Sequence, residues 1–262
     1  MLAGAGQGHK PAPASIHNRA LPATRHKRQR ETHPIMLEAI APDLWHLPHS
    51  FTASGLRVTS RMTVVRFKDG SLWLHSPVPL SADVRAQLVA LGTVRYIVAP
   101  NKMHHLFAGD CAAAFPEAVL YGARGLGKKR PDLRNLRELG RDIEPEWRDD
   151  LDQIPFDGIP LGNETVWLHR ASGTLILTDL CQWWRGPAPL ASRLYASLTG
   201  VRRQLAVPRT VRMAVKDRAA ARASAERILA WPFTRVIVAH DTIVETDAHR
   251  AAERALGWFL RG

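Results

Sequence analysis

The chain has 262 residues, 45% of them hydrophobic, which is enough to form a sizeable core in one large domain or two small ones. No apolar run approaches the roughly 20 residues that span a bilayer, and no signal-peptide pattern follows the N-terminal charges. The two cysteines, Cys111 and Cys181, lie in apolar stretches and cannot form a disulfide framework, which favours a reducing compartment. We therefore expect a soluble cytoplasmic protein with no membrane partner.

The formal net charge of +12 would suit a nucleic-acid partner, but its distribution does not favour one. Residues 1–35 hold six Lys or Arg and one Glu, so +5 of the charge lies there and +7 is spread over many helical segments. Residues 1–35 also lack a hydrophobic period, so burial cannot offset the entropy of ordering them, and we predict a disordered basic tail. Because Met36 opens the first patterned stretch, we predict one domain over 36–262. The tail is interpreted as an over-extended reading frame, with a functional basic arm as the alternative.

Strands and helices alternate along the first half of the domain. In chain order the pattern predicts a strand, a hairpin, a helix, a strand, a helix and a strand, at Ile40–Leu47, Arg61–Phe67 with Leu72–His75, Ser81–Leu91, Tyr96–Ala99, His104–Phe115 and Ala118–Tyr121. Lys68-Asp69-Gly70 is a strong turn signal for the hairpin, and Ser81 is expected to cap the first helix.

The second half begins with a polar, loop-rich stretch with short helical pieces over residues 122–152. The pattern then predicts a second hairpin, two helices, a strand and a last helix, at Glu164–His169 with Thr174–Leu180, Leu190–Leu198, Val215–Leu229, Thr234–Ala239 and Ala248–Leu260. Early hairpins followed by strand–helix alternation predict a mixed α/β (α+β) fold with helices covering the sheets. A doubly wound fold would usually show a glycine-rich phosphate turn after its first strand, and this chain has none.

Each of four buried strands runs into histidine or aspartate. These residues are His75, the adjacent His104 and His105, Asp179 and His240. Ligands gather beyond the carboxyl ends of strands in α/β folds, and imidazole and carboxylate suit Zn²⁺, Fe or Mn²⁺. We predict that these side chains converge on one divalent metal.

His104 or His105, Asp179 and His240 are the expected ligands, and His75 is the expected catalytic residue that orients water or the ligands. Two adjacent histidines on a helix point about 100° apart, so only one of His104 and His105 is expected in the site. As the alternative, His75 caps a strand in a turn, Asp179 caps a helix or forms a turn, and one of His104 and His105 faces solvent at the start of a helix.

Four segments carry a family resemblance: Leu72–Val78 (LWLHSPV), Ile97–Phe107 (IVAPNKMHHLF), Trp167–Leu180 (WLHRASGTLILTDL) and Val238–Asp241 (VAHD). They resemble the domain-of-unknown-function family numbered 4336, which is related to the metallo-β-lactamase superfamily. The resemblance covers residues 37–262 and implies an αβ/βα sandwich of two mixed sheets flanked by helices.

Superfamily metal sites use a His-x-His-x-Asp-His signature, a further His, a bridging Asp and a last His. Here Asn101 and Met103 replace the first two histidines of the signature. By the resemblance, Asp179 matches the bridging aspartate, His240 the last histidine and His169 the further one. A dinuclear site needs roughly six protein ligands, so the departure implies one ion at most.

These observations favour a metal-dependent hydrolase with a reduced, mononuclear site, acting on a small-molecule ester, thioester or phosphoester. The alternative is a non-catalytic binding or scaffold descendant of the same fold, and a nucleic-acid binder is supported by charge alone. A serine hydrolase has no support, because no Gly-x-Ser-x-Gly motif is present. Trp183 and Trp184 suit either a pocket wall or core packing.

Overall fold

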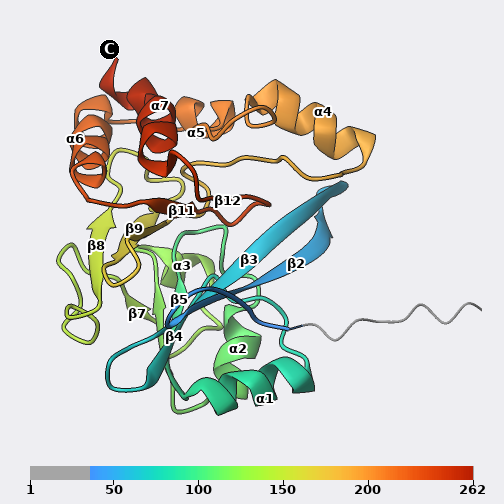
Figure 1. Ribbon diagram of the computed structural model, residues 1–262, viewed down its shortest axis with the longest axis vertical. Coiled ribbons are helices and arrows are strands. Elements are labelled where there is room, and N and C mark those ends of the chain that lie inside the picture. The colour runs from blue at the N-terminus through green and yellow to red at the C-terminus, as the bar shows by residue number, and fades with distance from the viewer. Residues whose placement is uncertain (1–35, 262) are drawn as a thin grey trace, which may run out of the picture. The chain divides into compact units, whose positions relative to one another are not determined.

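The computed structural model describes residues 36–261, and the predicted tail over 1–35 lies outside the described residues. Its strands form two sheets (Figure 1). The first sheet takes seven strands in chain order: Glu38–Ala41 (β1), Leu44–Ala53 (β2), Leu56–Arg66 (β3), Ser71–His75 (β4), Thr93–Ala99 (β5), Val119–Gly122 (β6) and Arg137–Glu138 (β7). The second has the order β12-β11-β10-β9-β8, from Leu151–Pro155 (β8), Thr165–His169 (β9), Thr174–Ile176 (β10), Arg235–Ile237 (β11) and Ile243–Val244 (β12).

Both sheets are mixed. Strands β1 to β4 pair antiparallel and β4 to β7 pair parallel. In the second sheet β10 and β11 are parallel, and the other pairs are antiparallel. The described helices are Ala82–Leu91 (α1), Ala108–Ala114 (α2), Leu126–Lys129 (α3), Leu190–Thr199 (α4), Arg209–Met213 (α5), Arg218–Leu229 (α6) and Ala248–Leu260 (α7).

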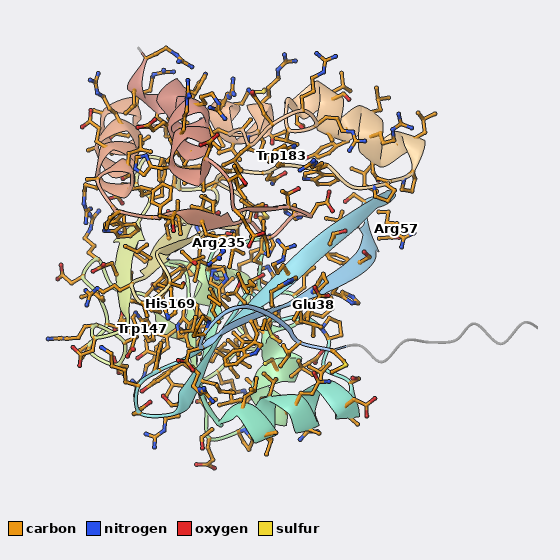
Figure 2. The ribbon with its side chains drawn as sticks, in the orientation of Figure 1. Glu38, Arg57, Trp147, His169, Trp183 and Arg235 are labelled. Carbon is orange, nitrogen blue, oxygen red and sulfur yellow. The ribbon has the colours of Figure 1, made fainter. Side chains whose placement is uncertain are left out.

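The alternation of side chains along each strand builds the layers. In β4, Leu72 and Leu74 pack with residues of α1 and α2, whereas Trp73 points the other way and packs with Trp167 of the second sheet. Trp147, labelled in Figure 2, belongs to the same inter-sheet core. Aromatic rings of this size bury a large apolar area, so the two sheets are held face to face by an apolar core.

The outer face of the second sheet is covered by α6 and α7, which lie on the opposite side of the sandwich from α1 and α2 (Figure 1). Leu175 and Val236 of neighbouring strands pack there with Ile228 and Leu256 of the two helices. The order of layers is therefore helix, sheet, sheet, helix. This confirms the predicted α/β (α+β) class and the αβ/βα sandwich of two mixed sheets flanked by helices.

Several predicted elements are confirmed in detail. The hairpins β3–β4 and β9–β10 form as antiparallel pairs, and α7 has the predicted bounds. Ser81 caps α1, because its side chain accepts a hydrogen bond from the Val84 backbone N–H. No helix over 36–261 is both long and apolar enough to cross a membrane.

Other predicted boundaries are wrong for local reasons. The single strand over Ile40–Leu47 is two strands, since Asp43 has φ 59° and forms a turn that its carboxylate ties to Arg66. The helix predicted from Val215 begins after Asp217, whose side chain caps the Ala220 N–H, and a separate helix, α5, precedes it. In the loop-rich stretch over 122–152, α3 is a short helical piece of the kind predicted, but the strand β7 and the start of β8 were not predicted.

Candidate metal centre

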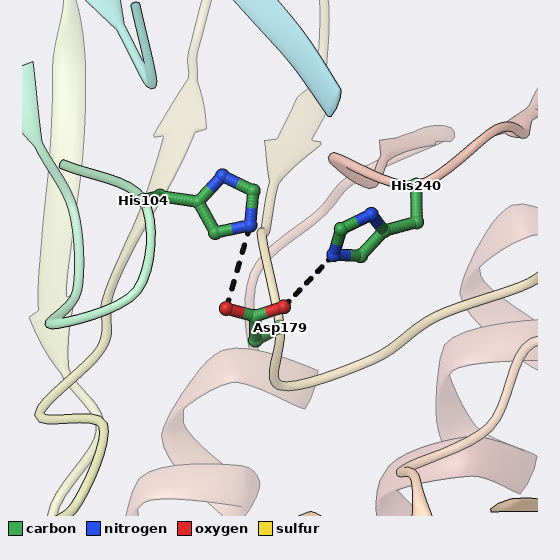
Figure 3. Close-up of side chains that lie close together, drawn as sticks. All are labelled: His104, Asp179 and His240. Carbon is green, nitrogen blue, oxygen red and sulfur yellow. Dashed lines mark hydrogen bonds and ion pairs between the residues drawn. The ribbon is translucent and has the colours of Figure 1, made fainter. Parts of the chain in front are cut away.

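Three of the predicted ligands lie together where the two sheets meet. His104, Asp179 and His240 each offer one ligand atom, and these atoms all lie within 4.8 Å of one another. Asp179 lies between the two rings (Figure 3): His240 Nε2 is 2.9 Å from its Oδ1, and His104 Nε2 is 3.4 Å from its Oδ2. Two imidazoles and one carboxylate can therefore face a common point.

Asp179 and His240 meet because β10 and β11 are parallel neighbours in register. Ile176 pairs with Ile237 at the ends of the two strands, and Asp179 and His240 follow these residues at equivalent positions. The backbone continues the pairing past the strand ends, since the Leu177 N–H donates to the Ile237 carbonyl over 2.9 Å. The carboxyl ends of adjacent parallel strands thus deliver two ligands side by side.

The second ring nitrogen of each histidine is held by another part of the chain. His240 Nδ1 donates to the Thr59 carbonyl of β3 over 2.7 Å, and His104 Nδ1 lies 2.7 Å from the Ser76 hydroxyl. Such bonds fix the orientation of metal-ligating histidines and leave the other nitrogen for the ion. Both Nε2 atoms are therefore aimed at Asp179 by contacts outside the cluster.

Asn101 joins the loop after β5 to the loop after β10. Its Oδ1 accepts hydrogen bonds from the Met103 and His104 N–H groups, at 2.7 and 2.8 Å. Its Nδ2 donates to Asp179 Oδ2 over 3.0 Å and also contacts Thr178. Asn101 is only 1% exposed.

Because Asn101 turns the backbone here, the helix predicted from His104 is wrong. Helix α2 begins at Ala108, and both histidines, His104 and His105, lie in the preceding turn.

Glu164 holds the loop after β10 in place through backbone hydrogen bonds. Its buried carboxylate accepts hydrogen bonds from the backbone N–H groups of Thr178, Asp179 and Leu180, at 2.8 to 3.0 Å, and a further one from Asn101. Sequence reasoning missed Glu164, because a glutamate at the start of a strand gives no pattern that indicates such a role.

The site is electrostatically coupled. Burial by itself would raise the pKa of Asp179, but His104 and His240 outweigh it and hold that pKa well below the usual range. Burial lowers the pKa of His104, yet the Asp179 carboxylate raises it more, so the net shift is upward. Burial and the neighbouring Asp179 charge raise the pKa of Glu164. Asp179 is therefore the carboxylate that stays ionised and available to a cation.

Arg61 anchors the loop that carries His240 to β3. Its guanidinium donates to the Val238 and Asp241 carbonyls, at 2.6 and 2.8 Å, and to His46 Nδ1 at 3.2 Å. Burial lowers the pKa of Arg61 to about 10. The Asp241 side chain, in turn, accepts a hydrogen bond from the Gly186 N–H, so this aspartate fixes the segment that leads to α4.

An apolar cavity of about 400 Å³ opens over the cluster. Asp179, His104 and His240 form part of its wall, and apolar residues from distant elements form most of the rest: Phe51, Phe107, Ile159, Leu161 and Val211. Among residues 36–261, no Lys or Arg lines it. The cavity therefore suits an apolar group placed next to the three polar side chains.

The structure leaves two of the predicted site residues outside the cluster. His75 is still part of β4, so its ring follows the alternation of that strand into the inter-sheet core, between Trp73 and Trp167. His105 points toward Arg130, whose Nη1 lies 2.9 Å from its Nδ1. Neither residue lines the cavity, and the catalytic role of His75 stays a prediction. His169 bonds to Ser172 within its own hairpin.

Two further sequence features have structural roles near the site. The Trp184 ring packs 5.5 Å from the His240 ring and 5.4 Å from the Tyr195 ring, centroid to centroid, and neither it nor Trp183 lines the cavity. Cys181 is fully buried, and burial raises the pKa of its thiol. A thiol that stays protonated is a poor nucleophile, so Cys181 packs as a small apolar residue.

Solved structures with the same fold share little sequence with this chain. A metallo-β-lactamase from Pontibacter korlensis has a TM-score of 0.60 at 10% identity, with 87% of this chain and 99% of that chain covered. The metallo-β-lactamase FIM-1 from Pseudomonas aeruginosa, in its mono-zinc form, has a TM-score of 0.56 at 14% identity, covering 88% and 98%. The Flv1 flavodiiron core from Synechocystis sp. PCC6803 has a TM-score of 0.57 at 12% identity, covering 86% and 60%. At these identities the likeness shows the fold, and the chain has the metallo-β-lactamase fold.

No curated protein matches the sequence. The sequence model of DUF4336, a domain of unknown function, matches residues 42–189, which is more than half of the chain. The match includes His104 and Asp179 and ends before α4, so His240 lies beyond it. On this match the chain belongs to the DUF4336 family.

Proposed function

We propose that the chain is a metal-dependent hydrolase with a single ion, held by His104, Asp179 and His240. The observation that carries the proposal is the convergence of their ligand atoms within 4.8 Å, with the second nitrogen of each ring held by Ser76 or Thr59. The FIM-1 structure, solved in a mono-zinc form, supports a single ion as compatible with this fold.

The donor set fits a divalent ion. Ligands of zinc lie about 2.0–2.2 Å from the ion, and hence roughly 3–4 Å from each other, so a small closure of the cluster suffices. Two imidazoles and a carboxylate suit Zn²⁺, Fe²⁺ or Mn²⁺ and leave at least one coordination position open. An ion in such a site acts as a Lewis acid and lowers the pKa of water that binds to it.

The chain itself supplies positioning and exclusion of solvent. Each Asp179 oxygen receives two contacts, Oδ1 from His240 and Gln182 and Oδ2 from His104 and Asn101. A carboxylate held in this way keeps its orientation when a ligand arrives. The apolar wall of the cavity reduces the contact of the two histidine rings with bulk water, since their side chains are only 8% and 10% exposed, whereas Asp179 keeps 22% of its side-chain surface open to the cavity.

The lining of the cavity favours an apolar group on the substrate, and among small-molecule esters, thioesters and phosphoesters it suits the uncharged ester and thioester better than the anionic phosphoester. Phe51, Phe107, Leu161 and Val211 offer apolar contacts, and among the described residues that line the cavity there is no Lys or Arg to pair with a substrate carboxylate. The reacting bond would lie at the polar end, beside Asp179.

The second candidate function is a non-catalytic binding module. It is favoured by Asn101, which stands where the signature has its first histidine and serves as a buried structural link between loops. Such a module would bind an apolar ligand in the cavity without an ion.

Metal analysis separates the two functions. We expect the purified full chain to contain about one equivalent of Zn, Fe or Mn by elemental analysis, and Asp179→Ala to lose the metal and all hydrolysis of apolar nitrophenyl esters. Asp152→Ala removes a surface carboxylate paired with Arg170 and serves as the control, which should keep both. A wild type that takes up no metal from supplemented buffer, and whose melting temperature does not respond to these ions, would leave the binding module in place.

A further inference from the structure

The segment from Gly186 to Lys216, which we name the basic cap, has an unusual charge distribution. It contains six Arg or Lys and no Asp or Glu. Its helices are α4 and α5. Among residues 36–261, none of these six cations forms an ion pair with an acidic side chain, and Arg193 and Arg203 are exposed. The basic cap therefore presents uncompensated positive charge.

The same cap exposes large apolar side chains on the solvent side of α4. Leu190, Leu194 and Leu198 are 78%, 56% and 61% exposed, and they follow one another at four-residue spacing. At about 100° per residue they form one stripe, opposite the face where Ser192 and Ala196 are buried. Leucines on this face contribute nothing to the core. An exposed apolar stripe of this kind marks an interaction surface.

We propose that the basic cap binds the surface of an anionic lipid bilayer. The leucine stripe would enter the boundary between headgroups and acyl chains, and the exposed arginines would contact lipid phosphates. A second copy of the chain fits less well, because a symmetric contact would bring the same uncompensated arginines together. A nucleic acid also fits less well, because its phosphates would pair with the arginines but the exposed leucines would remain in contact with water.

Docking there would bring the cavity next to lipid. The basic cap also lines the apolar cavity, through Tyr195, Thr210, Val211 and Ala214. A bilayer-bound cap would let an apolar substrate pass from the membrane toward Asp179, a consequence that rests on the proposed hydrolase function. Binding itself does not depend on that function. The sequence led us to expect no membrane partner, because no apolar run is long enough to span a bilayer. The helical pattern over α4 does not show which of its leucines remain exposed, so it gave no sign of a surface that binds a bilayer from one side.

Vesicle sedimentation with the full chain tests the proposal. We expect the chain to bind vesicles of phosphatidylcholine with phosphatidylglycerol, to bind pure phosphatidylcholine far less, and to be released by salt. The variant Leu190→Ser/Leu194→Ser/Leu198→Ser should lose at least about tenfold in vesicle affinity with an unchanged melting temperature, because the leucines lie outside the core. Arg193→Gln/Arg203→Gln should lose a similar factor. The matched controls are Val89→Ser, an exposed apolar residue of α1, and Arg250→Gln/Arg254→Gln on α7, which should bind as the wild type does.

Three results would overturn the proposal. In the first, the wild type does not bind anionic vesicles. Another is equal binding by the leucine variant, which would assign the affinity to positive charge elsewhere in the chain, residues 1–35 included. The third is a partner of another kind. The wild type could form a dimer that is lost in the leucine variant. Alternatively, duplex DNA could bind the leucine variant as tightly as the wild type and displace the wild type from vesicles. Loss of metal in Asp179→Ala would change none of these readings, so failure of the hydrolase proposal and failure of this one are distinguishable.

Discussion

The two sheets deliver their side chains to the site in different ways. In the second sheet, Asp179 and His240 lie at equivalent positions beyond two parallel strands in register, and pairing of the strands places them side by side. In the first sheet, β4 and β5 are also parallel neighbours, yet His75 turns into the core and His104 reaches the cluster from a turn built around Asn101.

The difference lies in where each strand stops. His75 is the last residue of β4, so its side chain obeys the alternation that also points Trp73 inward. Asp179 and His240 come after their strands have ended, where the backbone is free to turn the side chain toward the edge. The last residue of a strand therefore lies at the edge of the sheet, but its side chain can still point into the core. Only a residue beyond the end of the strand is free to turn its side chain into the site.

The second sheet depends on Glu164 to hold its loop, and removal of this residue should have the largest effect. Glu164→Ala leaves three backbone N–H donors without their acceptor in a buried place and removes one of the acceptors of the Asn101 amide, which keeps Thr178 and Asp179. We expect a loss of about 3 kcal/mol in the free energy of unfolding, measured by urea denaturation, together with loss of bound metal. Glu245→Ala, at an exposed pair with Arg235, should cost less than about 1 kcal/mol. Similar losses in the two variants would contradict the role given to Glu164.

Arg61 tests the link between the two sheets. Arg61→Met removes the donors of the Val238 and Asp241 carbonyls and frees the loop that carries His240. We expect a loss of about 2 kcal/mol in the free energy of unfolding and a metal affinity lowered about tenfold, as for other groups that orient ligands. Arg57→Met, at the exposed tip of the β2–β3 hairpin (Figure 2), is the control and should change neither quantity. An unchanged metal affinity in Arg61→Met would show that Thr59 alone suffices to place His240.

The sequence predicted many of the strands and helices because hydrophobic alternation and turn signals are local, whereas the sandwich of two sheets was implied by the family resemblance. Lys68-Asp69-Gly70 and Ser81 act within a few residues, and both features form as predicted. The β2–β3 hairpin was missed, since its turn at Ser54-Gly55 lies in a stretch of weak alternation.

The candidate site was only partly predictable for the opposite reason. Glu164 contacts residues 14 to 63 positions away, and Arg61 contacts a carbonyl 177 positions away. No periodicity encodes such contacts. The choice between His104 and His105 depended on the turn at Asn101, which a helical pattern concealed.

Because the His75 side chain at the end of β4 points into the core, it should make the free energy of unfolding depend on pH. Its ring is 1% exposed, neither nitrogen has a hydrogen-bond partner among the described residues, and burial with the nearby His104 lowers its pKa from 6.5 to about 3. Above pH 6.5 the ring is neutral in the folded and unfolded states and contributes nothing. As the pH falls below 6.5, the unfolded state takes up a proton that the folded state does not, so stability is lost.

The variant His75→Leu should therefore lose less stability on acidification. Between about pH 7 and pH 4.5 we expect the free energy of unfolding of the wild type to fall by roughly 2 kcal/mol more than that of the variant, measured by urea denaturation at each pH. At neutral pH the variant should be as stable as the wild type, because it removes two buried nitrogens without partners. Parallel pH curves for the two proteins would place the His75 ring in contact with water.

The adjacent His104 and His105 test the comparison through the direction of a single side chain. The effect expected for His105→Ala is the smallest of those predicted here. His104→Ala removes a ring whose Nε2 faces Asp179 and should abolish stoichiometric metal binding. His105→Ala removes a ring that contacts Arg130 instead, and Arg130 keeps its pair with Asp132, so metal content and affinity should stay within about twofold of the wild type. Both rings lie in the same turn, so local distortion would affect the two variants alike, and only the direction of the side chain separates them. Equal loss of metal in both variants would mean that the turn after β5, rather than the His104 ring, supplies what the ion requires.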